Sequence, residues 1–218
     1  MKSKHQARRR RRKLVILNHP LIDQDMLVLR DKRTGHIVFR EAMKRVSRIV
    51  ALEALSDIPV TYKAADTPLA RMRGRCVKGS VVFIPVLRAG LGLVEGFLDV
   101  FPSATVGHVG VYRNEDTLDP VEYLVRLPSR LRQSATIVLD PMLATGGSAC
   151  ATIALAKGQG ATNLTLATII AAPEGIARVR KEHPDVRLIT CAVDKKLNEK
   201  GFIVPGLGDA GDRLFGTL

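Results

Sequence analysis

The stretch from Ala135 to Ser148 most constrains the fold, because it joins a buried strand to a glycine-rich turn. Ile137-Val138-Leu139 is a short apolar run, typical of a parallel strand covered on both faces. Asp140 and Pro141 end it, since proline has no amide hydrogen for a sheet ladder. Thr145-Gly146-Gly147-Ser148 then opens onto a helix. The order strand, loop, helix is typical of an α/β domain.

The small residues of this turn predict a phosphate cradle. Glycines let backbone amides approach an anion closely, and the helix N-terminus behind them carries a partial positive charge. Thr145 and Ser148 add hydroxyl donors. Asp140 repels phosphate, so we expect it to hold sugar hydroxyls or a metal ion carried by the substrate. A turn that only caps the helix is the alternative interpretation of so short a motif.

Strands and helices alternate along the rest of the chain. We expect further strands at 81–87, 105–112, 121–127, 164–171 and 187–193. We expect helices at 39–57, 66–79, 91–101 and from Pro173 to about His183. The pair 105–112 and 121–127, joined by a polar turn, predicts a β-hairpin arm. The alternation predicts an open, mostly parallel sheet with helices on both faces, in one domain spanning 14–218.

Much of the positive charge lies in a short N-terminal tail. Residues 1–13 carry eight Lys or Arg and no acid, and without them the formal net charge falls from +13 to +5. We expect a disordered tail, and an arm for RNA is the alternative. No apolar run approaches the length of a membrane span. Three widely spaced cysteines form no disulfide framework, which favours a reducing cytoplasm.

Two charged groups are expected at the same edge of the sheet. Arg88 follows the strand at 81–87, and Asp140 follows the strand at 137–139. Ligands of open α/β sheets bind at the carboxyl ends of the strands. A cation before the helix at 91–101 also opposes the helix dipole, which favours a binding role for Arg88 over a solvated one.

Four separated motifs carry a family resemblance. They are Val86-Leu87-Arg88-Ala89-Gly90-Leu91-Gly92, Tyr112-Arg113-Asn114-Glu115, Asp140-Pro141-Met142-Leu143-Ala144-Thr145-Gly146-Gly147-Ser148, and Gly201-Phe202-Ile203-Val204-Pro205-Gly206-Leu207-Gly208-Asp209-Ala210-Gly211-Asp212. Together they resemble the motifs of the uracil phosphoribosyltransferases, over about residues 17–218. The family makes UMP and diphosphate from uracil and phosphoribosyl pyrophosphate (PRPP), a pentosyl transfer in UMP salvage. Pro141 stands where the wider superfamily usually has a second acidic residue.

The resemblance implies a fold and a set of site residues. The fold is a phosphoribosyltransferase-like sheet with a C-terminal hood, formed by about 195–218 and part of the N-terminal region. Uracil is implied to bind at Ile203, Gly208, Asp209 and Ala210, and the catalytic groups are Asp209, Asp140 and Arg88. PRPP is implied to bind at Arg88, Arg113, Asp140, Pro141, Met142, Leu143, Ala144, Thr145, Gly146, Gly147, Ser148 and Asp209. The pyrophosphate loop around Arg88 is also implied to have an unusual backbone geometry.

The resemblance also implies cofactors and partners. Mg²⁺ arrives on PRPP, and no resident metal site is expected. The family forms dimers or tetramers, and some members respond allosterically to GTP. Residues 201–212 contain too many glycines for a regular element, but backbone groups there could read the acceptor, donor, acceptor edge of uracil. An RNA-binding regulator of pyrimidine metabolism, with the basic tail as its arm, is the alternative function, and another base such as a purine or orotate is a third.

Overall fold

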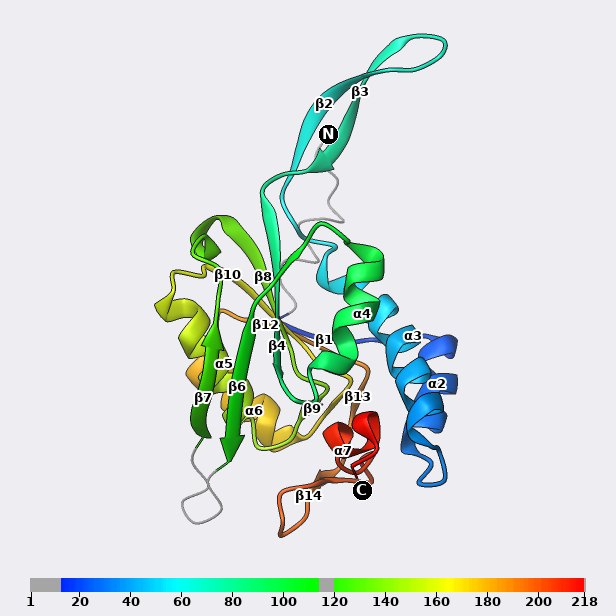
Figure 1. Cartoon of the computed structure of the whole chain (residues 1–218), viewed down its shortest axis with the longest axis vertical. Coiled ribbons are helices and arrows are strands. Elements are labelled where there is room, and N and C mark those ends of the chain that lie inside the picture. Colours follow the sequence, from blue (N-terminus) through cyan, green and yellow to red (C-terminus); the bar gives the residue numbers. More distant parts are fainter. Residues whose placement is uncertain (1–12, 114–119, 218) are drawn as a thin grey trace.

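One central sheet organises the residues that the structure, a computed structural model, describes, namely 13–113 and 120–217 (Figure 1). Its strands follow the order β1-β12-β10-β8-β4-β6-β7, and β5 also pairs with β4. They are β1 (Leu14–Ile16), β4 (Ser80–Leu87), β5 (Thr105–Val106), β6 (His108–Arg113), β7 (Pro120–Arg126), β8 (Ser134–Leu139), β10 (Asn163–Ala167) and β12 (Arg187–Thr190). Every pair is parallel except the β6–β7 hairpin. The predicted mostly parallel sheet and the hairpin at 105–127 are confirmed.

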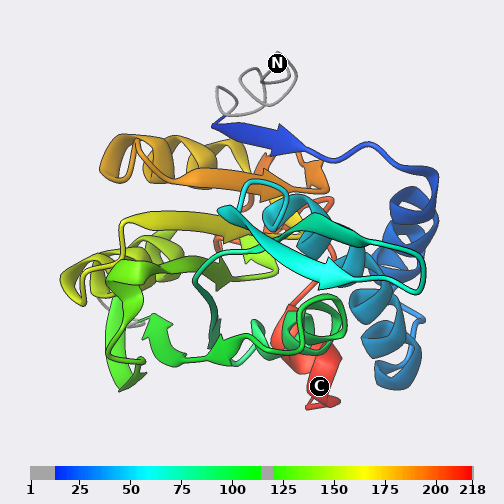
Figure 2. The ribbon, with the colours of Figure 1, turned by 90° about the horizontal axis from the view of Figure 1, so that it is seen from above.

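Helices cover both faces of this sheet (Figure 2). On one face lie α2 (Pro20–Arg30), α3 (His36–Ala54) and α4 (Leu91–Val100), and on the other α5 (Gly147–Gly158) and α6 (Pro173–Glu182). Strand β8 supplies both cores, because side chains alternate along a strand. Ile137 and Leu139 pack with the first set of helices, and Val138 packs with the second. No helix of the described residues is long and apolar enough to cross a membrane.

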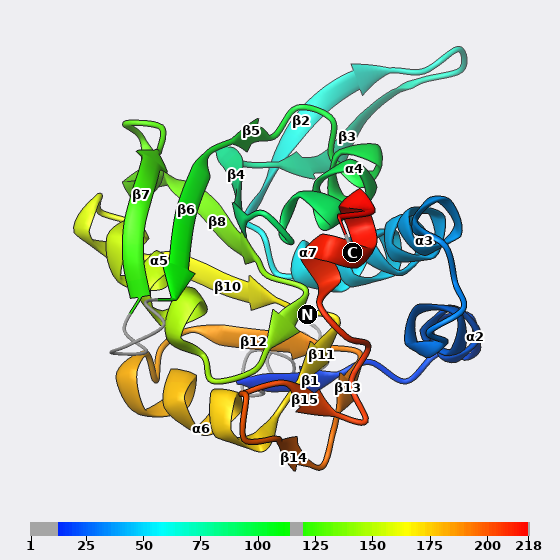
Figure 3. The same cartoon turned by 60° about the horizontal axis from the view of Figure 1, so that its bottom comes forward.

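Short ladders extend the sheet at its carboxyl edge, which faces the viewer in Figure 3. Strands β9 (Met142–Leu143), β11 (Ile170–Ala171) and β13 (Ala192–Val193) pair in parallel, each just after a long strand. Strands β14 (Lys196–Leu197) and β15 (Ile203–Val204) form a small antiparallel pair. The short helix α7 (Ala210–Phe215) then follows. The expectation that 201–212 holds no regular element was wrong, because Asp209 caps this helix by accepting a hydrogen bond from the Asp212 amide.

The helix expected at 66–79 is wrong. Strands β2 (Val60–Asp66) and β3 (Arg71–Val77) form a hairpin that projects from the amino edge of the sheet (Figure 1). Polar and apolar residues alternate along 71–77, which is the period of a strand. Thr67 closes the turn around Pro68, since its amide and hydroxyl both donate to the Ala70 carbonyl. Proline at that position suits a turn better than a helix interior.

The N-terminal region contains two elements that the sequence pattern did not predict. Strand β1 pairs in parallel with β12 at the edge of the sheet. Helix α2 begins at Pro20, and the ring of His19 caps it by accepting a hydrogen bond from the Leu21 amide. Helix α3 begins at His36, three residues before the expected start at Phe39.

Candidate functional site

The turn after β8 adopts the shape that the sequence predicts. The chain leaves β8 at Asp140, passes through β9, and enters α5 at Gly147. Gly146 takes the left-handed conformation with φ of 79°, and its carbonyl accepts the first helical hydrogen bond, from Cys150 at 2.9 Å. The amides of the first turn of this twelve-residue helix therefore point out of its N-terminus.

Asp140 is buried at the entrance of this turn. It is only 7% exposed, its Oδ2 accepts a hydrogen bond from Ser148 Oγ at 3.1 Å, and its Oδ1 accepts one from the Met142 amide at 3.4 Å. Burial raises the pKa of this carboxyl to about 6, and the two hydrogen bonds act in the opposite direction. Ser148, which the sequence assigns to phosphate, thus also holds Asp140.

The other residues of the loop divide into buried and accessible groups. Pro141, Leu143 and Gly146 are buried, and Leu143 belongs to the core. The remaining residues are half-buried: Met142, Ala144, Thr145, Gly147 and Ser148. Buried side chains leave only backbone groups for a ligand, so polar contacts from side chains fall to the hydroxyls of Thr145 and Ser148.

Helix α6 fixes this loop from below. A Cβ on Gly175 would lie 2.5 Å from the carbonyl oxygen of Ala144 and 2.8 Å from that of Leu143. No side chain fits at that distance, so only glycine lets α6 approach the loop so closely. Gly175 therefore has a structural role in setting the position of this loop.

The turn after β4 brings Arg88 to the same edge. The Leu87–Arg88 peptide bond is cis, and the Gly90 amide donates to the Val86 carbonyl at 2.8 Å. A Cβ on Gly90 would lie 2.4 Å from the Leu139 carbonyl oxygen, so this turn packs directly against the end of β8. The Arg88 side chain is 53% exposed, and its Nη2 donates to Asp212 Oδ1 at 2.8 Å.

Residues after β15 reach this edge from the C-terminal side. Gly208 and Asp209 are exposed, whereas Ile203 and Ala210 are buried in the core. Only the backbone of the two buried residues could meet a base. The exposed pair lies at the start of α7, next to the acid that holds Arg88.

Two arginines outside the predicted set hold this C-terminal segment. Arg30 donates to both carboxylate oxygens of Asp194, at 2.8 and 2.7 Å, and to the Gly206 carbonyl at 2.8 Å. Arg213 is buried and donates to the carbonyls of Leu29, Leu207 and Asp31. Sequence patterns missed both, because the partners of Arg30, and the Leu29 and Asp31 carbonyls that Arg213 reaches, lie far away in the chain.

The hairpin residue Arg113 is placed only in part. It ends β6, and its backbone pairs with Pro120 of β7. Its side chain, and residues 114–119 of the same motif, lie outside the described residues. The structure therefore brings Asp140, Arg88 and Asp209 to one edge and leaves the contacts of Arg113 open to experiment.

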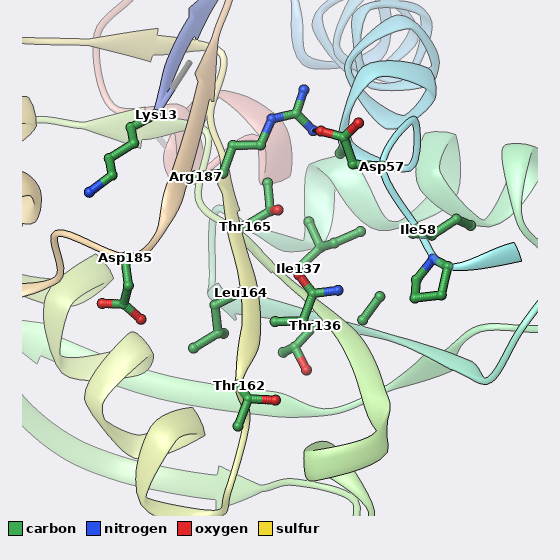
Figure 4. A pocket seen from close by; sticks show the side chains of 14 residues that line it. Lys13, Asp57, Ile58, Thr136, Ile137, Thr162, Leu164, Thr165, Asp185 and Arg187 are labelled. Carbon is green, nitrogen blue, oxygen red and sulfur yellow. Dashed lines mark ion pairs between the residues drawn. The ribbon is translucent and has the colours of Figure 1, made fainter. Parts of the chain in front are cut away.

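A cavity lies at the opposite, amino edge (Figure 4). It encloses about 300 Å³ between the starts of β8, β10 and β12 and the end of α3. Arg187 lines this cavity and forms ion pairs with Glu53 and, at 3.4 Å, with Asp57. Lys157 pairs with the rim residue Asp185 at 2.6 Å. Of the charged residues that line this cavity, Asp57, Asp185 and Arg187 are held in ion pairs.

One close group of metal-ligand types occurs among the described residues, behind α5. It contains Cys150, Glu182 and His183. Two basic side chains already contact this group. Arg178 donates a hydrogen bond to Glu182 at 2.8 Å, and Lys157 Nζ lies 3.4 Å from His183 Nδ1. This arrangement explains the group without an ion, and it agrees with a structural role for the histidine.

Known proteins share this architecture along almost the whole chain. The family model described as uracil phosphoribosyltransferase matches residues 15–217. Uracil phosphoribosyltransferases of Symbiobacterium thermophilum and Levilactobacillus brevis are 50% and 48% identical over 206 residues, which are 94% of this chain and 99% of each relative. The AQ2163 protein of Aquifex aeolicus, a solved structure, is 38% identical with a TM-score of 0.88, over 93% of this chain and 97% of that one. An adenine phosphoribosyl transferase of Trypanosoma brucei, 14% identical with a TM-score of 0.56 over 83% of this chain and 84% of that one, shares the fold alone. The chain therefore belongs to the uracil phosphoribosyltransferase family.

Proposed function

We propose that this chain carries out the family's pentosyl transfer, in which uracil and PRPP give UMP and diphosphate. Three segments at the carboxyl edge, the β8–α5 turn, the β4–α4 turn and the hood, each bind a different part of the substrates. The observation that carries the proposal is their convergence. The β4–α4 turn packs against the end of β8, and the same turn is bonded to α7. One ligand can therefore touch all three.

The first segment, the turn between β8 and α5, holds the sugar phosphate. The amides at the start of α5 and the Thr145 hydroxyl bind the 5′-phosphate of PRPP. The Ser148 hydroxyl has one hydrogen, so it joins them when it turns from Asp140 to the phosphate. The backbone of Pro141, Met142, Leu143, Ala144, Gly146 and Gly147 shapes this cradle. Asp140 accepts hydrogen bonds from the ribose hydroxyls, which requires its ionised form.

The second segment holds the leaving group. Arg88, with Arg113 from the hairpin, contacts the diphosphate, and its fixed positive charge stabilises the negative charge that develops there. The donor set of the loop suits Mg²⁺ that arrives with PRPP, because Asp140 is the only carboxylate in 140–148. When bound, this ion neutralises charge on the diphosphate.

The third segment, the hood formed by about 195–218 with α2 and α3, selects the base. Backbone groups at Ile203, Gly208 and Ala210 read the acceptor, donor, acceptor edge of uracil, so that the base is selected by uncharged groups. Asp209 orients or accepts the N1 proton as N1 attacks the anomeric carbon. Its exposed carboxylate at the α7 cap is free of the core and within reach of a ligand.

The projecting hairpin supports a homodimer or homotetramer. Exposed Val60, Tyr62, Leu69, Met72 and Val77 lie on β2, β3 and their turn. An isolated two-stranded hairpin with exposed apolar residues is only marginally stable in water, so a second copy of the chain is a suitable cover. GTP regulation is a prediction from the family resemblance alone. The three free thiols suit a cytoplasmic setting.

A coupled assay tests the proposed function. Purified protein is mixed with uracil, PRPP and Mg²⁺, and diphosphate release is followed, with adenine, hypoxanthine and orotate as competing bases. We expect diphosphate release when uracil is the base, and no release with adenine, hypoxanthine or orotate. Absence of turnover together with salt-sensitive RNA binding that is lost when residues 1–13 are removed would instead favour the RNA-binding regulator.

A further inference from the structure

Asp212 is an acid of α7 to which neither sequence motif nor family comparison assigns a role. Its Oδ1 accepts two hydrogen bonds, one from Arg88 Nη2 at 2.8 Å and one from Thr217 Oγ1 at 2.7 Å. The Thr217 hydroxyl and the Arg88 guanidinium hold the pKa of this carboxyl below its usual range. Asp212 therefore stays ionised and fixed on both sides.

The contact leaves most of the Arg88 guanidinium available. A guanidinium has five N–H donors, and among the described residues only one Nη2 contact is made. The ring of Phe215, on the same helix as Asp212, lies 5.9 Å from the guanidinium carbon. Arg88 is thus oriented by α7, while its half-exposed side chain keeps donors that can receive an anion.

Close packing makes this orientation rigid. A Cβ on Gly92, in the first turn of α4, would lie 2.6 Å from Leu214 Cδ1, so α4 and α7 are in close contact at this point. Asp212 also lies in the same helical turn as Asp209, whose Oδ1 accepts a hydrogen bond from the Asp212 amide at 3.0 Å. A shift of Arg88 toward a ligand therefore pulls on the same turn that carries the residues for the base.

We propose that Asp212 is a positioning residue that aims Arg88 at the diphosphate and couples that contact to the base-binding turn 208–210. The proposal rests on the proposed role of Arg88 in binding diphosphate. Energetic coupling between two ligands is reciprocal, so diphosphate tightens the binding of uracil by the same factor by which uracil tightens the binding of diphosphate.

Calorimetry with magnesium diphosphate and uracil tests this assignment in the full chain. We expect Asp212→Asn to weaken diphosphate binding about tenfold, which is the loss expected for one charge-assisted contact. In this variant, the affinity for uracil measured without diphosphate should change less than twofold. The increase in uracil affinity that diphosphate causes in the wild type should disappear. Asp185→Asn, which removes an exposed ion pair at the other edge, is the matched control and should leave both values unchanged.

Arg88→Gln separates the two ideas. If Arg88→Gln leaves diphosphate binding unchanged, the proposed role of Arg88 fails. If Arg88→Gln weakens binding but Asp212→Asn does not, the role of Asp212 is overturned. The double variant should bind no worse than Arg88→Gln, because Asp212 acts through that arginine, and additive losses would contradict this.

A second variant covers the case in which Asp212→Asn fails to fold in urea titrations. Thr217→Val removes the other hydrogen bond to Asp212 and leaves the ion pair in place. We expect diphosphate binding to weaken about threefold, since a hydrogen bond with one charged partner contributes less than the ion pair with Arg88. An unchanged affinity in a folded Thr217→Val protein would overturn the proposal.

Discussion

The two edges of the central sheet use similar residues in opposite ways. At the amino edge, Arg187 lies in a well-formed cavity, and Glu53 and Asp57 share its charge. At the carboxyl edge, Arg88 has one acidic partner among the described residues and is half-exposed beside backbone amides. The comparison teaches that exposure of the arginine, more than cavity volume, distinguishes the edge at which we propose that an anion binds.

The largest expected effect falls on the carboxyl edge. We expect Asp140→Asn to lower kcat/KM by a factor of about 10²–10³, because the amide cannot accept the ribose hydroxyls in the same way. Steady-state kinetics with PRPP as the varied substrate measures this change. Asn is close in size to Asp, so circular dichroism should show a folded protein, and near wild-type turnover would break the comparison.

The amino edge should respond through stability. Arg187→Met removes one partner of a mostly buried ion-pair group, and we expect the free energy of unfolding to fall by about 3 kcal/mol. Urea titration measures this loss. KM and kcat should stay within about twofold of wild type, as for a site remote from the chemistry. A selective rise in the KM for PRPP would place a functional role at this edge.

The pKa of Asp140 predicts a pH-dependent cost at the carboxyl edge. Its folded-state value of about 6 lies above the ordinary 3.8, so the folded protein holds this proton more tightly than the unfolded chain. Stability should therefore fall as pH rises from about 4 to above 6, by about 2 to 3 kcal/mol for this group.

Comparison with Asp140→Asn isolates that contribution. The free energy of unfolding of the wild type, relative to that of Asp140→Asn, should fall as the pH rises from 4.5 to 7.5. Because activity needs the ionised carboxylate, turnover should decline below about pH 6. A stability difference that is flat across this range would contradict burial as the cause of the raised pKa.

The smallest effect sharpens the comparison within the site. Gly175→Ala places a methyl group against the carbonyls of Leu143 and Ala144, and we expect the KM for PRPP to rise about tenfold as the cradle shifts. Gly158→Ala is the matched control, since a Cβ there meets nothing within 4 Å. Equal kinetics for the two variants would show that α6 does not set the loop geometry.

Local patterns in the sequence predicted the strands and turns that form the carboxyl edge. The apolar run before Asp140 and the small residues after it sufficed for β8 and α5, because strand and helix-start signals are local. The same reasoning predicts a helix at 66–79, where the alternating residues 71–77 instead form strand β3. Contacts between remote residues, such as Arg30 with Asp194 and Arg88 with Asp212, leave no periodic trace and needed the structure.

The pairing of β1 with β12 has a consequence for synthesis of the chain. Leu14 pairs with Leu188, so the N-terminal strand has no partner until nearly all of the domain has been made. Until then β10 is an open edge, because β12 pairs with it only in the finished sheet. Strand β10 itself carries the apolar residues Leu164 and Leu166. Open edges of this kind invite aggregation, and late long-range pairing slows folding. Protein interrupted before residue 187 should therefore be a preferred client of chaperones.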